Sequence, residues 1–103
     1  MGKYLLAYRG GGMAESEAER DAAMAAWGAW FTKLGSAVAD MGAPFAGCAA
    51  VTQGGAVSDG GASGLTGYSV LEADSMSVAT DYAKSCPLLA SGGSIDVYEA
   101  HAM

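Results

Sequence analysis

One stretch near the start of the chain decides the fold class: Lys3-Tyr4-Leu5-Leu6-Ala7-Tyr8-Arg9. In an extended strand, successive side chains point to opposite faces. The even-numbered positions of this stretch carry tyrosine or leucine, and Leu5 and Ala7 occupy the positions between them. Both faces of the predicted strand are therefore apolar, so the strand needs cover on both sides.

A long amphipathic helix is predicted next, from about Ser16 to Asp40. Ser16 and Glu19 form a capping-box pattern, and acidic residues in the first turn suit the positive end of a helix. Gly42 and Pro44 are expected to end it. Apolar residues recur at helical spacing in a stripe about 120° wide: Ala23, Met24, Trp27, Trp30, Phe31, Leu34, Val38 and Met41.

The rest of the chain predicts two more strands, a glycine-rich connection, a second helix and a final strand. Six glycines in the fourteen residues from 54 to 67 indicate a hairpin connection or a mobile loop. Asp74 or Ser75 is the expected N-cap of the second helix, which Pro87 ends or kinks, with one further turn possible after it. The predicted strands are Cys48–Thr52, Thr66–Ala73 and Ser94–Ala100.

The resulting order, β-α-β-β-α-β, predicts a single α+β domain over residues 1–103 with a ferredoxin-like fold. Right-handed crossovers make this order a four-stranded antiparallel sheet with both helices on one face. The other face keeps apolar residues from the first and last strands. A second copy of the same sheet is the simplest cover for them, so we expect a homodimer.

Composition excludes several classes of function. Of 103 residues, 51% are hydrophobic and 16% are charged, which argues for a folded domain. Five Lys and Arg residues against eleven Asp and Glu residues give a net charge of −6. This balance opposes binding to nucleic acid or to an anionic membrane surface. No apolar run is long enough for a signal peptide or a membrane span, so a cytoplasmic location is expected.

Four segments spread over the whole chain resemble the YCII-related (DGPF-domain) family. The resemblance implies a dimeric α/β barrel, in agreement with the predicted element order, and a small-molecule enzymatic role whose chemistry is largely unassigned in the family. The matching segments are Lys3-Tyr4-Leu5-Leu6 with Tyr8, Ala26-Trp27-Gly28-Ala29-Trp30-Phe31, Gly67-Tyr68-Ser69-Val70-Leu71-Glu72-Ala73-Asp74, and Cys86-Pro87 followed by Gly92-Gly93-Ser94-Ile95-Asp96-Val97-Tyr98.

Two departures from the family pattern affect the expected chemistry. One branch of the family pairs a histidine in the first helix with an aspartate after the second strand, but the only histidine here is His101. Asp59 corresponds to the aspartate of the Asp-Gly-Pro-Phe motif, whose Pro-Phe is replaced by Gly61 and Ala62. The catalytic dyad is therefore not carried over to this chain.

The candidate catalytic residues are Asp59 and His101. Asp59 suits a general base in a loop that folds over a pocket, and equally a turn residue that bonds nearby backbone. His101 could serve as an acid or base near neutral pH, or lie exposed in the tail.

The candidate ligand-binding residues are Arg9, Trp27, Trp30 and Tyr68. Arg9 could clamp a carboxylate or form a surface ion pair. The two tryptophans suit core packing or the wall of a cleft between helix and sheet, and Tyr68 could offer its hydroxyl to a ligand.

Three further features predict little chemistry. Gly10-Gly11-Gly12 resembles a phosphate-cradling loop but suits a plain turn better, because the following acidic residues would repel an anion. Cys48 and Cys86 lack metal-ligand spacing and are expected as two buried free thiols, with a disulfide as the alternative. No metal site, nucleophile motif or cofactor is predicted.

Two hypotheses for function follow. The first is a cytoplasmic homodimer that holds a small organic molecule in its barrel interior or helix–sheet cleft. Metal-free acid–base chemistry is the expected reaction class if this homodimer is an enzyme. The second is a non-enzymatic association or regulatory module that uses its apolar sheet face.

Overall fold

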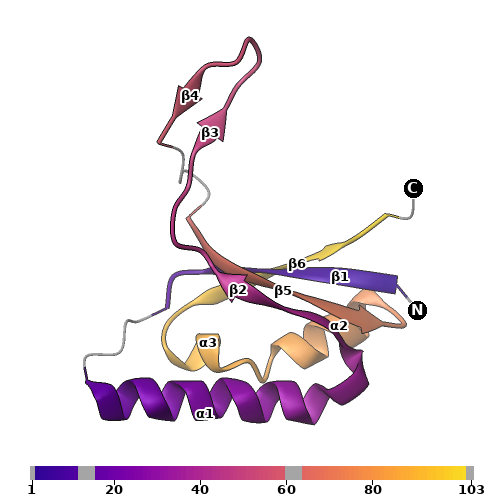
Figure 1. Cartoon of the computed structure of the whole chain (residues 1–103). Helices are drawn as coiled ribbons and strands as arrows, with labels where there is room; N and C mark the ends of the chain where they lie inside the picture. Colours follow the sequence, from indigo (N-terminus) through magenta and orange to yellow (C-terminus); the bar gives the residue numbers. More distant parts are fainter. Residues whose placement is uncertain (1, 12–15, 60–63, 102–103) are drawn as a thin grey trace.

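The computed structural model describes residues 2–11, 16–59 and 64–101 of the chain. It confirms the α+β class and the four-stranded antiparallel sheet, with the helices on one side of that sheet (Figure 1). In chain order the elements are β1 (Gly2–Arg9), α1 (Glu17–Leu34), the 3₁₀ turn η1 (Gly35–Ala37), β2 (Val38–Pro44), β3 (Ala50–Val51), β4 (Val57–Ser58), β5 (Leu65–Ala73), α2 (Met76–Ala83), α3 (Pro87–Ala90) and β6 (Ser94–Glu99).

The main sheet has the strand order β2-β5-β1-β6, with antiparallel pairing throughout. The two-sided apolar strand β1 is an inner strand, and its Leu5 lies opposite Val70 of β5 and Tyr98 of β6. Leu6, on the other face of β1, is completely buried. The alternation of apolar side chains in β1 therefore supplies both the core and the helix-free face.

The main core lies between the sheet and the helices. Leu6 and Tyr8 of β1 and Leu71 of β5 pack there against Trp30 of α1 and Leu88 of α3. A smaller cluster joins Tyr4, Ala73 and Ala79 at the other end of the sheet. Burying side chains of this size is the main source of stability for a domain this small.

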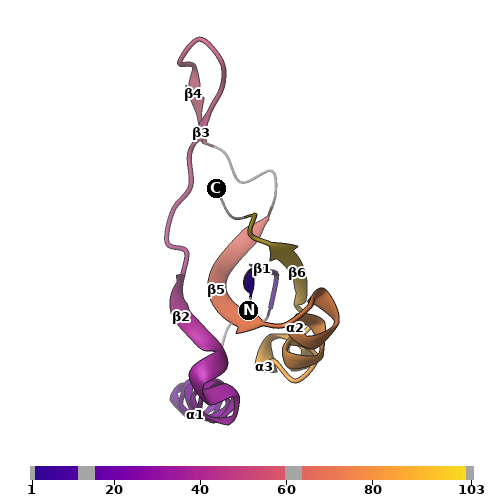
Figure 2. The same ribbon diagram turned by 90° about the vertical axis from the view of Figure 1, so that its right-hand side faces the viewer.

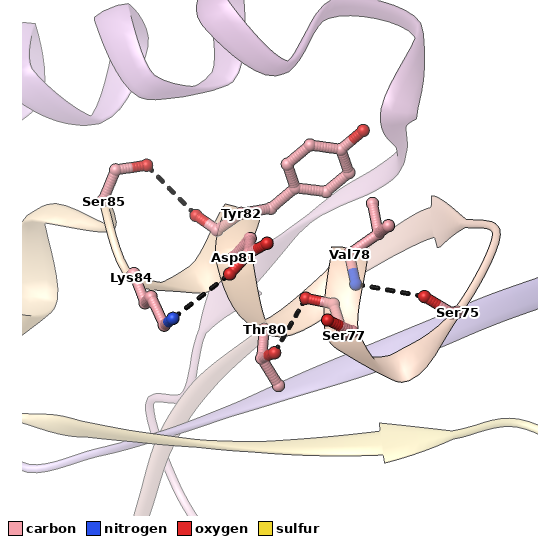
Figure 3. A network of polar contacts seen from close by, with 8 residues as sticks. All are labelled: Ser75, Ser77, Val78, Thr80, Asp81, Tyr82, Lys84 and Ser85. Carbon is pink, nitrogen blue, oxygen red and sulfur yellow. Dashed lines mark hydrogen bonds and ion pairs between the residues drawn. The ribbon is translucent and has the colours of Figure 1, made fainter.

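Helix α2 is held by short-range polar contacts, which Figure 3 shows. Ser75 is its N-cap, as predicted: the Ser75 hydroxyl accepts a hydrogen bond of 3.3 Å from the Val78 N–H. At the other end of α2, the Ser85 hydroxyl donates to the Tyr82 carbonyl at 3.1 Å. Lys84 and Asp81 add an exposed ion pair of 3.2 Å, which contributes little to stability.

The predicted end of the first helix is wrong. Helix α1 ends at Leu34, because Gly35 has a positive φ of 57° and its N–H donates to the Phe31 carbonyl. The following residues form β2 at the edge of the sheet. Val38 and Met41 continue the helical apolar spacing by coincidence, but pairing with β5 satisfies the backbone of β2 and of the β5 edge together.

The strand predicted over Cys48–Thr52 is consequently not part of the main sheet. Its Ala50–Val51 portion is β3, which pairs only with β4 in a separate two-stranded ribbon. We call residues 46–59 the arm. Figures 1 and 2 show that the arm projects from the body on the side of the sheet away from the helices. The radius of gyration, 15.0 Å, accordingly exceeds the roughly 13 Å expected for a compact chain of this length.

The cysteine prediction is half right. Both thiols are free, and Cys86 is buried in the core as expected. Cys48 is exposed, because the arm carries it away from the body. Among the described residues, no helix is long and apolar enough to cross a bilayer.

Gly42 should be essential for the path of β2. It has a φ of 74°, and a Cβ there would overlap the Tyr68 carbonyl oxygen. We expect Gly42→Ala to lower the free energy of unfolding by more than about 2 kcal/mol, measured by urea denaturation. Gly47→Ala is the control, since a Cβ at Gly47 has no atom within 4 Å. Equal stability of the two variants would contradict this account of β2.

The buried thiol of Cys86 should make stability depend on alkaline pH. Burial raises the pKa of Cys86 from 9.0 to about 11, so above pH 9 the unfolded chain loses a proton that the folded chain retains. Stability is therefore fully present below pH 9 and decreases as the pH rises toward 11, by roughly 2 kcal/mol. Denaturation at pH 8–11 measures this slope. Cys86→Ala should reduce this slope most clearly between about pH 9 and 10, below the range in which the raised pKa of the buried Tyr8 adds its own dependence. Cys48→Ala, which removes the exposed thiol, should keep the slope; equal slopes in both variants would contradict the assignment.

Candidate functional site

A cavity of about 830 Å³ lies between α1 and the part of the sheet formed by β1, β5 and β2. Helix α1 forms one wall, the edge strand β2 a second, and β5 with Tyr8 a third. Leu88 of α3 also lines the space. The wall residues of the three elements are Met24, Trp27, Gly28, Phe31 and Thr32 of α1, Met41 to Pro44 of β2, and Thr66 to Ser69 of β5.

The spacing of residues on α1 produces the first wall. Residues three and four apart lie on the same face of a helix, so Met24, Gly28 and Phe31 form one row toward the sheet. Gly28 widens the cavity because it has no side chain, and a Cβ built there would have no atom within 4 Å. Trp27 completes an aromatic wall, with its ring centroid 5.3 Å from that of Tyr8 and 6.0 Å from that of Phe31.

Two linked hydroxyl groups, those of Tyr8 and Ser69, form one polar part of the cavity, and Thr32, Thr66 and Tyr68 also line it. The Tyr8 hydroxyl donates to Ser69 Oγ at 2.6 Å, and Ser69 Oγ donates to the Met41 carbonyl at 2.7 Å. Burial raises the pKa of Tyr8 far above its ordinary value, so its hydroxyl stays protonated at neutral pH. With its proton given to Ser69, the Tyr8 oxygen keeps capacity to accept a hydrogen bond.

The cavity carries no formal charge at neutral pH among the described residues that line it. A charged group placed there would lose part of its hydration without gaining an opposite charge, which disfavours its binding. The described residues also contain no cluster of three or more His, Cys, Asp or Glu side chains that could hold a metal ion. The site is therefore a largely apolar cavity whose polar groups are uncharged hydroxyls, with Tyr8 and Ser69 joined by a hydrogen bond.

Two of the predicted ligand-binding residues, Trp27 and Tyr68, line the cavity. Because Tyr68 alternates with the buried Ser69 along β5, its ring lies toward the helix-free face, where it stacks on Phe45. Trp30 instead packs in the core, where its indole N–H donates to the Tyr82 carbonyl and to Ser85 Oγ, each at 3.1 Å. Arg9 forms an ion pair of 2.8 Å with Asp96 and is not among the described lining residues.

The two candidate catalytic residues are not brought to the cavity. Asp59 is exposed at the end of the arm, just after β4, and His101 is exposed beyond β6. Neither is among the described residues that line the cavity. Gly10 and Gly11 both have positive φ, and a Cβ on Gly11 would lie 2.7 Å from Leu88 Cδ1, so these glycines permit a close-packed turn. Gly12, the third of that run, is outside the described residues.

Sequence reasoning missed several residues of the cavity, chiefly Gly28, Ser69 and strand β2. Ser69 does carry a signal, since a lone hydroxyl within an apolar strand must find a partner when it is buried. Gly28 carries a weaker one, because a glycine within a helix costs about 1 kcal/mol relative to alanine and usually has a packing reason. Strand β2 was not predicted, because its first residues were included in the predicted first helix.

The Tyr8–Ser69–Met41 chain should behave as one unit in a double-mutant cycle. Ser69→Ala leaves the Tyr8 hydroxyl and the Met41 carbonyl unpaired and should cost about 1–3 kcal/mol of stability. Tyr8→Phe leaves the Ser69 bond to Met41 intact and should cost about 1 kcal/mol. The double variant should lose less than the two costs combined, whereas additive losses would show that the hydroxyls act independently. Thr32→Val, which removes the exposed hydroxyl that donates to Gly28, is the control and should change stability by less than about 0.5 kcal/mol.

A scan against protein-family models and a search of the curated proteins both returned no match for this chain.

Proposed function

We propose that this protein binds an uncharged, largely apolar small molecule in the cavity between α1 and the sheet. The observation that carries this proposal is the cavity itself, with its volume of about 830 Å³ and its lining free of formal charge in the described part of the chain. Small-molecule sites usually have volumes of roughly 300–1,000 Å³, with apolar walls and a few polar groups. The cavity has both properties.

The walls also specify the chemical class of the ligand. Trp27 and Phe31 offer aromatic surfaces on which a flat ring system can pack. The Tyr8 hydroxyl already donates its proton to the completely buried Ser69, so the ligand should donate a hydrogen bond to the Tyr8 oxygen through a hydroxyl or N–H group. A neutral aromatic compound with one such donor fits these requirements best.

Binding takes precedence over acid–base catalysis in this proposal. Tyr8 and Tyr68 are the only titratable groups among the described residues that line the cavity. Burial raises the pKa of Tyr8, which opposes a role as a general base at neutral pH. The two candidate catalytic residues, Asp59 and His101, lie elsewhere in the structure and are not among the described residues that line the cavity.

The proposal includes assembly as a cytoplasmic homodimer related to the YCII family, with a ferredoxin-like subunit and a dimeric α/β barrel. The strand order β2-β5-β1-β6, with the helices on one side, is compatible with such a subunit. The chain exposes 6848 Å², against about 5,300 Å² for a folded monomer of its mass. This excess also favours the second candidate function, an association module, and the two functions can coexist.

Two related dyes test the cavity. N-phenyl-1-naphthylamine is neutral and has one N–H donor, whereas 8-anilinonaphthalene-1-sulfonate has the same rings and an added negative charge. We expect the neutral dye to bind with enhanced fluorescence and at least tenfold more tightly, because the cavity offers the sulfonate no counter-charge. Equal affinity for the two dyes, or no binding of the neutral dye, would contradict the proposal.

A pair of neighbouring substitutions on α1 localises the binding. Gly28→Phe should fill the cavity and abolish binding of the neutral dye, because its side chain enters space that is open now. Ala29→Phe is the matched control, since Ala29 is exposed and is not among the described lining residues. Loss of binding in both variants, or in neither, would place the dye outside this cavity. Circular dichroism checks that both variants remain folded.

A further inference from the structure

The arm, residues 46–59, is a water-exposed ribbon almost without charge. From Met41 to Ser58 the chain contains no Asp, Glu, Lys, Arg or His residue. Val51 and Val57 lie opposite each other across the ribbon, and each is 69% exposed. Exposed strand edges usually carry charged residues that prevent pairing with other chains. The arm lacks this protection, which is typical of a segment that packs against another surface.

The arm also has little to hold it in place by itself. Each strand of the ribbon has only two residues, and its tip is closed by the Thr52 N–H, which donates to the Ala56 carbonyl at 2.9 Å. Two-stranded ribbons of this size are marginally stable in water. A partner surface would supply the missing burial.

The arm and the helix-free face of the sheet border the same space. Figures 1 and 2 show the arm rising on the side of the sheet opposite α1, α2 and α3. On that face Tyr98 is 53% exposed, in line with Leu5 of β1 and Val70 of β5. At the root of the arm, Phe45 stacks on Tyr68 with ring centroids 5.9 Å apart. The apolar surface therefore continues from the sheet onto the arm.

The charges of this face suit a second copy of the same chain. Although the chain has a net charge of −6, both cations of β1 have an acidic neighbour: Lys3 is in register with Glu72, and Arg9 forms its ion pair with Asp96. Local compensation of this kind limits repulsion between two identical faces. The exposed surface exceeds that of a monomer of this mass by roughly 1,500 Å², and a specific interface needs only about 800 Å² from each partner.

We propose that the arm is a clasp that grips a second copy of this chain stacked on the helix-free face of the sheet. The arm extends for seven or eight residues in each direction, which gives a reach of roughly 20–25 Å. Stacked sheets lie about 10 Å apart, so the arm is long enough to span the interface and contact the edge of the partner's sheet. In a two-fold dimer each copy gives one arm and receives one. This inference rests on the homodimer in the proposed function and adds the element that holds it.

A charge-neutral double substitution tests the clasp. Val51→Lys with Val57→Glu places opposite charges across the ribbon, which preserves the hairpin and the net charge but makes its apolar face polar. We expect the dissociation constant of the dimer, measured by sedimentation equilibrium, to rise at least tenfold. The matched control is Leu89→Lys with Met76→Glu, which introduces the same two residues at exposed apolar positions in the helix layer. This control should leave the dissociation constant unchanged.

Three results would overturn the clasp: a wild-type chain that is monomeric at every concentration, an arm variant that dimerises like the wild type, or equal weakening by the arm variant and the control. A failure of the ligand proposal can be distinguished from a failure of the clasp, because the cavity lies on the helix side of the sheet and the clasp acts on the other side. The dye titration of the ligand proposal can be carried out on the same variants, and the arm variant should retain dye binding.

Cys48 provides a second measurement of the clasp. Ellman's reagent should modify this exposed thiol faster as dilution releases the arm, and an unchanged rate would count against the clasp.

Discussion

A chain of two hydrogen bonds, one buried and one partly buried, runs from Tyr8 through Ser69 to the Met41 carbonyl and attaches the edge strand β2 to the sheet. These two hydrogen bonds are important because the backbone pairing between β2 and β5 is irregular, with register shifts on both sides of Asp40. Ser69 is completely buried, so either bond would be costly to leave unmade. The cavity wall and the root of the arm both depend on the position of β2.

The sequence predicts the elements whose signals are local and unambiguous. β1 and β6 follow from alternation of apolar residues, and α2 follows from its Ser75 cap. The end of α1 could not be predicted, because Val38 and Met41 extend the helical stripe and Gly35 carries no mark that distinguishes it from Gly28 within the helix. Only the free edge of β5, a feature of the assembled sheet, explains why the chain turns into a strand there.

The candidate site was partly predictable for a similar reason. Trp27 and Tyr68 could be proposed as cavity residues because large aromatic side chains commonly line such spaces. Trp30 looked equivalent on the helical wheel, but its N–H is used by Tyr82 and Ser85, which are distant in sequence. Gly28 is important because it has no side chain, and the space that this leaves open cannot be predicted from the pattern of residue types.

The edge strand β2 has two roles at once: residues 41–44 form a wall of the cavity, and the chain then continues through Phe45 into the arm. A compound that presses this wall outward would tilt the base of the ribbon with it. In the proposed dimer, thermodynamic linkage then requires that ligand binding changes the dimer affinity by the same factor by which dimerisation changes the ligand affinity. A single irregular strand would thus connect the cavity to the subunit contact of the proposed dimer.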